Sequence, residues 1–203
     1  MNVLIDRLQA LLDGEGRKIL GIAGPPGSAK STIAQGLAQA MGSRAAVVPM
    51  DGFHLANEEL ERLGRRDRKG APDTFDVDGY RALLDRLRAD GPETVYAPRF
   101  DRAIETAVAG AIPIGPEVRL VITEGNYLLL DAPGWADISE RLDESWFVAM
   151  SDETRRKRLL ARRARAGDDP DQAVAWIEGV DEPNARLIAP TASRADVLVR
   201  LDD

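Results

Sequence analysis

The segment between residues 24 and 32 has the composition of a loop that binds phosphate groups. It comes between an apolar run and a helical pattern. Small residues let backbone N–H groups curl around phosphate oxygens, and the N-terminus of the following helix adds a favourable dipole. In such a loop Lys30 would reach the β and γ phosphates, and Ser31 would bind Mg²⁺. The loop residues are Gly24, Pro25, Pro26, Gly27, Ser28, Ala29, Lys30, Ser31 and Thr32.

This loop departs from the usual pattern at one position. Ala29 stands where the pattern G-x-x-x-x-G-K-[ST] has its second glycine. We expect a negative φ at Ala29, where alanine would stabilise the fold by about 0.4–1 kcal/mol through the unfolded chain. A plain Gly/Pro turn is the alternative interpretation of the segment. It is disfavoured because only four of the 27 basic residues are lysines, and one of them occupies the required position.

Two acidic residues at the ends of other apolar runs could complete a phosphoryl-transfer site. Asp51 ends the run at 45–51, where a carboxylate could take a proton from an attacking hydroxyl, worth about 10²–10⁴-fold in rate. A simple Asp-Gly turn is the alternative. Glu124, near the end of the run at 118–125, could hold Mg²⁺ or its bound water; an ordinary loop glutamate is the alternative. His54, the single histidine, is a weaker candidate substrate contact, since a lone histidine is more often structural.

An arginine-rich helix is predicted over residues 151–166. Arg158 and Arg162 are four residues apart and share one face of it. Arginines on a closing lid stabilise the charge on a transferred phosphoryl group while the lid excludes water. A solvated charged face is the alternative, but the concentration of arginine in an acidic chain favours the lid. The segment 62–70 is also basic, and we expect it to be mobile or to face an anion.

Alternating strand and helix patterns must position these residues. The expected strands cover 18–24, 45–51, 118–125, 144–150 and 196–201, and the expected helices cover 2–13, 31–41 and 77–89. Helices rather than tight hairpin turns separate the strands. This order predicts an α/β fold with a parallel sheet and a ligand site at the carboxyl ends of the strands.

Composition limits the class of protein. The 203 residues carry a formal charge of −7, which fits one globular domain over 1–203 with a mobile lid. The absence of cysteine excludes disulfides, thiolate metal sites and cysteine nucleophiles, and fits a reducing cytoplasm. We expect no membrane insertion, because there is no signal peptide and no run of about 18 apolar residues. The net acidity argues against nucleic acid as a partner.

With these residues identified, the chain resembles the P-loop kinase family that contains uridine kinase, phosphoribulokinase and type I pantothenate kinase. It is most similar to bacterial members described as fructose transport system kinases or as pantothenate-kinase-like. The resemblance extends from the phosphate loop to the last strand. It implies a P-loop NTPase fold, a mostly parallel sheet flanked by helices, with an arginine-rich helical lid over about 151–180. It also implies Mg-ATP as phosphate donor and a hydroxyl of a small metabolite as acceptor.

The resemblance assigns roles by position. Asp51 falls at the family's catalytic aspartate, Glu124 at the acidic residue of its E-G motif, and Arg158 and Arg162 at its lid arginines. The segment 72–76, Pro-Asp-Thr-Phe-Asp, resembles a uridine kinase segment whose first aspartate binds sugar hydroxyls. The segment 96–101, Tyr-Ala-Pro-Arg-Phe-Asp, resembles one that contacts the acceptor. The acceptor contacts implied in this way are Asp73, Arg99, Phe100 and Asp101.

The acceptor is expected to be a sugar such as fructose, or a sugar-like alcohol. Pantothenate ranks lower because Leu187 stands where the pantothenate kinases have a substrate-binding asparagine, and Asn184 is displaced from that position. Nucleoside or pantothenate kinase activity is the first alternative. A regulator of a sugar transport system that binds ATP without turnover is the second. A GTP-driven switch is disfavoured because no lysine lies in an N/T-K-x-D segment. The resemblance makes a homo-oligomer a further expectation.

Overall fold

The apolar runs form a parallel sheet of five strands in the order β2-β5-β1-β6-β7. The computed structural model describes residues 2–201. The strands are β1 Lys18–Ala23, β2 Ala45–Pro49, β5 Leu120–Gly125, β6 Glu144–Ala149 and β7 Val197–Arg200. All neighbouring pairs are parallel, and each strand lies within two residues of its expected bounds. The predicted parallel sheet is therefore confirmed.

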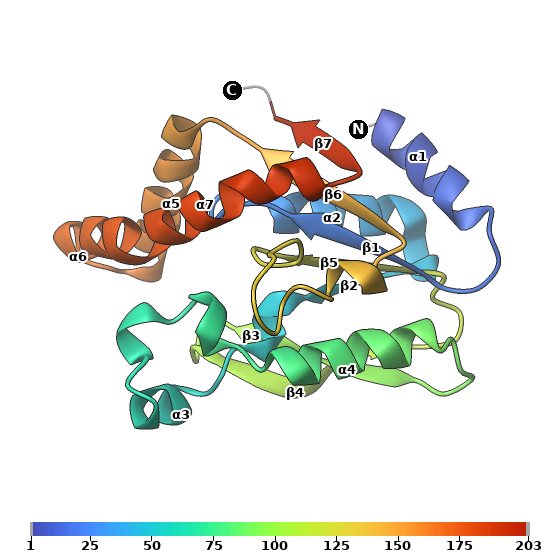
Figure 1. Cartoon of the computed structure of the whole chain (residues 1–203), viewed down its shortest axis with the longest axis horizontal. Coiled ribbons are helices and arrows are strands. Elements are labelled where there is room, and N and C mark those ends of the chain that lie inside the picture. The colour runs from blue at the N-terminus through green and yellow to red at the C-terminus, as the bar shows by residue number, and fades with distance from the viewer. Residues whose placement is uncertain (1, 202–203) are drawn as a thin grey trace.

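Helices cover both faces of this sheet (Figure 1). They are α1 Asn2–Leu12, α2 Lys30–Met41, α3 Asn57–Arg62, α4 Val77–Arg88, α5 Asp152–Ala166, α6 Pro170–Trp176 and α7 Glu182–Ile188. Successive side chains of a strand point to opposite faces. Ile22 of β1 therefore packs with Leu37 of α2 on one face, while Ala23 packs with Leu84 of α4 on the other. The burial of both faces explains why the strands read as continuous apolar runs.

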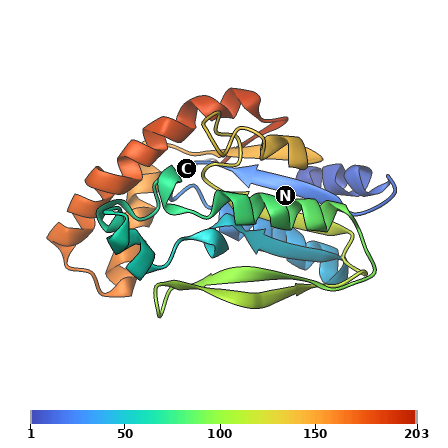
Figure 2. The same cartoon turned by 60° about the horizontal axis from the view of Figure 1, so that its bottom comes forward.

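The structure also contains a hairpin that the sequence analysis did not predict. Strands β3 Val95–Asp101 and β4 Thr106–Ile114 form an antiparallel pair outside the main sheet, visible as a separate ribbon in Figure 2. Pro98 lies where the register of this pair shifts, and β4 consists largely of small residues. Neither strand therefore shows the alternation of large apolar and polar residues that predicts a strand. The hairpin matters because it brings Phe100 and Arg102 to the side of the site where β2 ends.

A second feature that positions the site is an arm of helices at the C-terminal side of the sheet. This arm, residues 152–188, consists of α5, α6, a π-helical turn at Ile177–Asp181 and α7. In Figures 1 and 2 it extends beyond the edge of the sheet, and the turn that follows α3 lies across from its tip. The arm and that turn therefore lie on opposite sides of the carboxyl ends of the strands.

Candidate active site

The phosphate loop connects β1 to α2, as its sequence predicts. Gly24 and Gly27 both have positive φ, of 152° and 82°. A Cβ at Gly24 would lie 2.8 Å from the Val148 carbonyl oxygen, and one at Gly27 would lie 2.9 Å from that of Arg155. Only glycine fits at these two positions, because a side chain would meet backbone atoms. The loop is thereby packed against β6 and α5 while its N–H groups remain at the start of α2.

Ala29 contradicts the expected backbone conformation. Its φ is 71°, in the left-handed region, immediately before the first residue of α2. The prediction of a negative φ was wrong because the loop must reverse direction at this residue to begin the helix. Left-handed conformation costs an L-residue about 1–2 kcal/mol. The strain lies in the turn that presents Lys30, which fits the tendency of backbone strain to occur at functional sites.

Lys30 is the first residue of α2 and is buried. Its Nζ donates to the Pro25 carbonyl oxygen at 3.0 Å and to Oδ1 of Asn126 at 2.9 Å. Burial lowers the pKa of Lys30 to about 8, while the nearby Glu124 and Asp51 carboxylates act in the opposite direction. The ammonium group is held inside the loop, where a phosphate would take the place of lost water.

Asn126 is a site residue that the sequence analysis missed. It follows β5, and Gly125 of that strand pairs with Ala23 at the end of β1. The residue after β5 must therefore lie beside the phosphate loop. The order of strands in the sheet carries this information, and a linear motif search does not contain it.

Ser31 and Glu124, the two candidate Mg²⁺ ligands, lie side by side. The Ser31 hydroxyl donates to Oε1 of Glu124 at 2.8 Å. Burial, followed by the nearby Asp51 carboxylate, raises the pKa of Glu124, and Lys30 and Ser31 oppose this shift. Hydroxyl and carboxylate oxygens are the hard ligands that Mg²⁺ prefers, so this donor set fits that ion. No cluster of three acidic or histidine side chains that could hold a metal is found in residues 2–201. Water and phosphate oxygens are the usual further ligands of a protein-bound Mg²⁺.

Asp51 lies in the short helical turn Met50–Phe53 directly after β2. Its Oδ2 is 3.4 Å from Nη2 of Arg102, which comes from the turn of the β3–β4 hairpin. The side chain of Asp51 is 37% exposed, so its carboxylate remains accessible to an acceptor. A Cβ at Gly52 would lie 2.5 Å from the Pro98 carbonyl oxygen. Glycine at this position therefore lets the hairpin approach the Asp51 turn.

His54 is held in an aromatic cluster beside Asp51. Its Nδ1 lies 2.8 Å from the Asp51 carbonyl oxygen and must donate, since a carbonyl can only accept. Its ring centroid is 4.1 Å from that of Phe75 and 4.9 Å from that of Phe100. Burial is the main cause that lowers the pKa of His54. The neutral ring therefore supports the turn of Asp51 and the predicted acceptor residue Phe100.

The basic segment 62–70 is folded onto the acceptor side. Arg68 pairs with Asp73 at 2.8 Å and Arg65 pairs with it at 3.4 Å. The anion that these arginines face is therefore a carboxylate of the same chain. Lys69 is buried, and its Nζ donates to Oδ1 of Asn57 and to the Glu105 carbonyl oxygen, each at 2.7 Å.

The remaining predicted acceptor residues lie on β3. Arg99 is exposed, whereas Phe100 is half-buried and lies 4.9 Å below the Lys69 ammonium group. Asp101 accepts a hydrogen bond at 2.9 Å from the backbone N–H of Ala103 and so supports the hairpin turn. Of these three residues, Phe100 is the one that the structure brings into contact with His54.

The arginines of α5 divide into buried and exposed residues. Arg155 is fully buried, with Nη2 at 2.6 Å from Glu182 and Nη1 at 3.4 Å from the Pro26 carbonyl oxygen. It fastens α5 to the phosphate loop, a role that the sequence analysis did not assign. Arg158 is exposed. Arg162 is 45% exposed, and its Nη2 lies 3.8 Å from Oδ1 of Asp181. Its positive charge is close enough to Lys30 to lower the pKa of that lysine.

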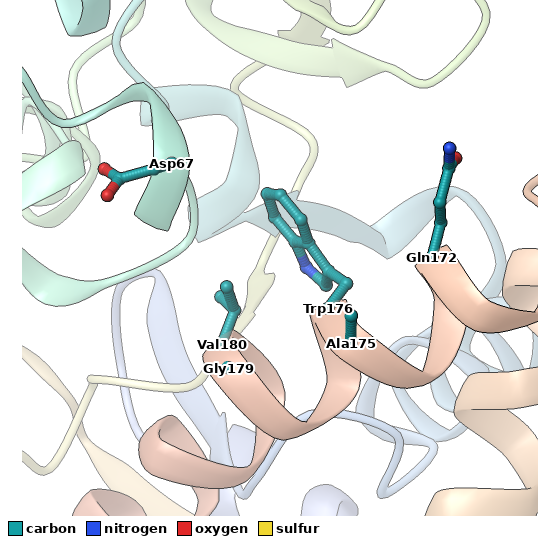
Figure 3. A pocket seen from close by; sticks show the side chains of 6 residues that line it. All are labelled: Asp67, Gln172, Ala175, Trp176, Gly179 and Val180. Carbon is teal, nitrogen blue, oxygen red and sulfur yellow. The ribbon is translucent and has the colours of Figure 1, made fainter.

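A groove separates the arm from the basic segment. It has a volume of about 450 Å³ and is lined by Asp67, Gln172, Ala175, Trp176, Gly179 and Val180. In Figure 3 Trp176 and Val180 point from the arm into this space, with Asp67 on the other side. The Arg163 guanidinium lies 4.6 Å from the Trp176 ring. The groove therefore lies between the arm and the segment 62–70.

A parallel sheet, a phosphate loop at the start of α2 and acidic residues at the neighbouring strand ends define a P-loop phosphotransferase. The chain belongs to the phosphoribulokinase/uridine kinase family, whose model matches residues 19–201. It is thus an ATP-dependent P-loop kinase. Within residues 2–201, no helix has both the length and the apolar character needed to cross a membrane.

Relatives with three different names are similar to this chain. "Putative uridine kinase C227.14" of Schizosaccharomyces pombe is 36% identical, over 97% of this chain and 88% of its own. The "Pantothenate kinase" of Clavibacter sepedonicus is 30% identical, over 91% of this chain and 66% of its own. The crystal structure of a "putative fructose transport system kinase" from Silicibacter sp. TM1040 is 43% identical, with a TM-score of 0.86 and coverage of 97% of both chains.

Proposed function

We propose that this protein transfers the γ-phosphoryl group of Mg-ATP to a hydroxyl of a small, uncharged alcohol. The observation that carries the proposal is the meeting of three groups at the carboxyl ends of adjacent strands. Lys30 begins the helix that follows the phosphate loop after β1, and Asp51 and Glu124, at the ends of β2 and β5, lie close enough to raise its pKa against the effect of burial. A phosphate-binding cation, a metal-binding carboxylate and a second, accessible carboxylate are the groups that phosphoryl transfer to an alcohol requires.

In the proposed reaction each group has one role. The Asp51 carboxylate takes the proton of the acceptor hydroxyl as that oxygen attacks the γ-phosphorus. The bond from the γ-phosphorus to the bridging oxygen breaks, and ADP leaves. Lys30 and the loop N–H groups hold the β and γ phosphates. Arg162 and Arg158, on the same helix, close over the transferred group. They belong to a lid that consists of about residues 151–180 and is part of a single domain.

Ser31 and Glu124 would hold Mg²⁺, which neutralises phosphate charge when bound. The short contact between their oxygens places two suitable ligands side by side. The reaction would take place in the cytoplasm, without a nucleic acid as partner.

The charge of the acceptor side supports a neutral acceptor. Arg65 and Arg68 are paired with Asp73, and Arg102 is paired with Asp51. An anionic acceptor such as a sugar phosphate would have to compete with these carboxylates for the guanidinium groups. An alcohol with several hydroxyls can instead accept from the arginines and donate to the carboxylates. A sugar such as fructose, or a sugar-like alcohol, meets this requirement, and the name of the 43% identical solved structure points the same way.

A nucleoside acceptor is the second candidate. The rings of His54 and Phe100 lie 4.9 Å apart and form an aromatic surface beside Asp51, on which a base could stack. The name of the Schizosaccharomyces pombe relative agrees with this alternative.

The test is ADP release with Mg-ATP, measured against fructose, other ketoses, pentoses, ribulose 5-phosphate, uridine, cytidine and pantothenate. We expect one neutral sugar or sugar-like alcohol to raise turnover at least about a hundredfold above the water background. Stimulation by ribulose 5-phosphate alone would contradict the neutral acceptor. Tight ATP binding with no stimulation by any acceptor would instead favour a regulator that binds ATP without turnover.

A further inference from the structure

The turn of π-helix at Ile177–Asp181 interrupts the arm between α6 and α7. A π-helical turn is rare and frequently occurs at functional sites. Asp181 is the last residue of this turn and is only 6% exposed. The π-helical turn therefore directs the Asp181 carboxylate toward the interior at the middle of the arm.

Glu182, the residue after Asp181, is a carboxylate with a structural role in this arm. Glu182 lies 2.6 Å from Nη2 of Arg155, a buried side chain that also contacts the Pro26 carbonyl oxygen of the phosphate loop. This well-formed ion pair fastens α5 to α7. Because Arg155 is committed to Glu182, it makes no hydrogen bond to Asp181 in the described residues.

Among residues 2–201, Asp181 has no comparable partner. Its Oδ2 is buried and receives no hydrogen bond from the residues that the structure describes. Its Oδ1 lies 3.8 Å from Nη2 of Arg162. Both side chains are close enough to Lys30 to influence its pKa, which Asp181 raises and Arg162 lowers. A buried carboxylate with an unpaired oxygen is costly to the fold, so its presence beside the site calls for a functional explanation.

We propose that Asp181 is a positioning residue for Arg162. The carboxylate keeps the guanidinium group near Lys30, where it can meet the phosphoryl group in transfer. This inference rests on the proposed function, since it concerns an arginine that acts on that group. The loose 3.8 Å contact leaves Arg162 free to adjust, whereas the 2.6 Å pair of Arg155 and Glu182 does not. The π-helical turn supplies the inward direction of Asp181 that a regular helix would not.

The test is a double-mutant cycle of Asp181→Asn and Arg162→Ala. The readouts are the Kd of Mg-ADP and the Kd of Mg-ADP with aluminium fluoride, which mimics the phosphoryl group in transfer. We expect Asp181→Asn to change the Kd of Mg-ADP by less than about threefold. It should weaken binding of the mimic about 10- to 100-fold, the effect of losing one charged hydrogen bond, here the one from Arg162 to the mimic. It should have no further effect when Arg162 is already alanine, because the two residues act as one unit.

Glu178→Gln is the matched control, since Glu178 lies in the same π-helical turn and contacts Arg156 at 3.6 Å instead. It should change neither Kd. If Asp181→Asn does not fold, Asp181→Glu tests the same contact, and we expect intermediate binding of the mimic with unchanged binding of Mg-ADP. Unchanged binding of the mimic in either variant would overturn the inference. So would equal weakening in the presence and absence of Arg162, which would indicate a structural role. If the wild-type protein binds the mimic no more tightly than Mg-ADP, the proposed function itself fails.

Discussion

The Nζ of Lys30 donates to Oδ1 of Asn126 at 2.9 Å, so a buried cation joins the phosphate loop to the end of β5. The second acceptor of this ammonium group is the Pro25 carbonyl oxygen of the loop itself. The lysine is thus held in place before any phosphate arrives. A preorganised cation costs less to bring into position when ligand binds.

Asn126→Ala should destabilise the protein and weaken ATP binding. A buried ammonium group that loses one of its two acceptors costs about 1–3 kcal/mol of stability. We expect the Kd of Mg-ATP to rise about tenfold. Urea unfolding and calorimetric titration measure the two effects. Asn57→Ala is the matched control, because Asn57 accepts from the other buried lysine, Lys69. That variant should lose stability and keep its ATP affinity; equal loss of ATP affinity in both would contradict the role of Asn126.

Asp51→Asn should abolish most turnover while leaving the nucleotide site intact. The amide keeps the shape of the side chain but cannot take the proton of an acceptor hydroxyl. We expect kcat to fall by about 10²–10⁴-fold, with the Kd of Mg-ATP nearly unchanged. Asp78→Asn, at a 90% exposed carboxylate on α4, is the control and should have no effect. Turnover at the wild-type rate in Asp51→Asn would exclude Asp51 as the base.

Ala29→Gly should stabilise the protein, because glycine adopts a φ of 71° without strain. The relieved strain is about 1–2 kcal/mol, and the greater freedom of glycine in the unfolded chain offsets about 0.5–1 kcal/mol of it. We therefore expect a net gain of about 0.5–1 kcal/mol in the free energy of unfolding. Ala38→Gly, within the regular part of α2, should instead cost about 1 kcal/mol. If both variants are destabilised alike, the left-handed conformation at Ala29 carries no strain.

His54 should make the protein less stable at mildly acidic pH. Burial lowers its pKa below the ordinary 6.5, so the folded state prefers the neutral ring. Well above pH 6.5 the ring is neutral in both the folded and the unfolded state and contributes nothing to the pH dependence of stability. Below it the unfolded chain takes up a proton first, and stability falls by up to about 1.4 kcal/mol per pH unit until the folded pKa is reached.

Two measurements check this pH dependence. Because His54 is the single histidine, one imidazole resonance in the NMR spectrum reports its pKa directly. Urea unfolding at several pH values should show that the free energy of unfolding of the wild type falls at acidic pH. The fall should be smaller in His54→Gln. A pKa of 6.5 or higher for the folded ring would contradict the predicted direction.

The sheet and the phosphate loop could be predicted from the sequence, and so could the choice of Ser31 and Glu124 as candidate Mg²⁺ ligands. These features follow from local signals: apolar runs give buried parallel strands, and the spacing of small residues, lysine and serine gives the loop. Because parallel strands place their carboxyl ends at one edge, residues that follow different strands must meet there. Asp51 and Glu124 could therefore be expected near Lys30 without any coordinates.

The arrangement of the arginines, and of the residues that support the site, depends on packing between segments distant in sequence. Arg155 and Arg162 look alike in the sequence, yet one is buried on Glu182 and the other faces Asp181. Their difference arises from the packing of α5 on a π-helical turn, which no sequence pattern predicts. The positive φ of Ala29 and the hairpin that brings Arg102 to Asp51 are likewise set by contacts distant in sequence. Local propensity is a weak prior at such positions, because packing and chain direction outweigh it.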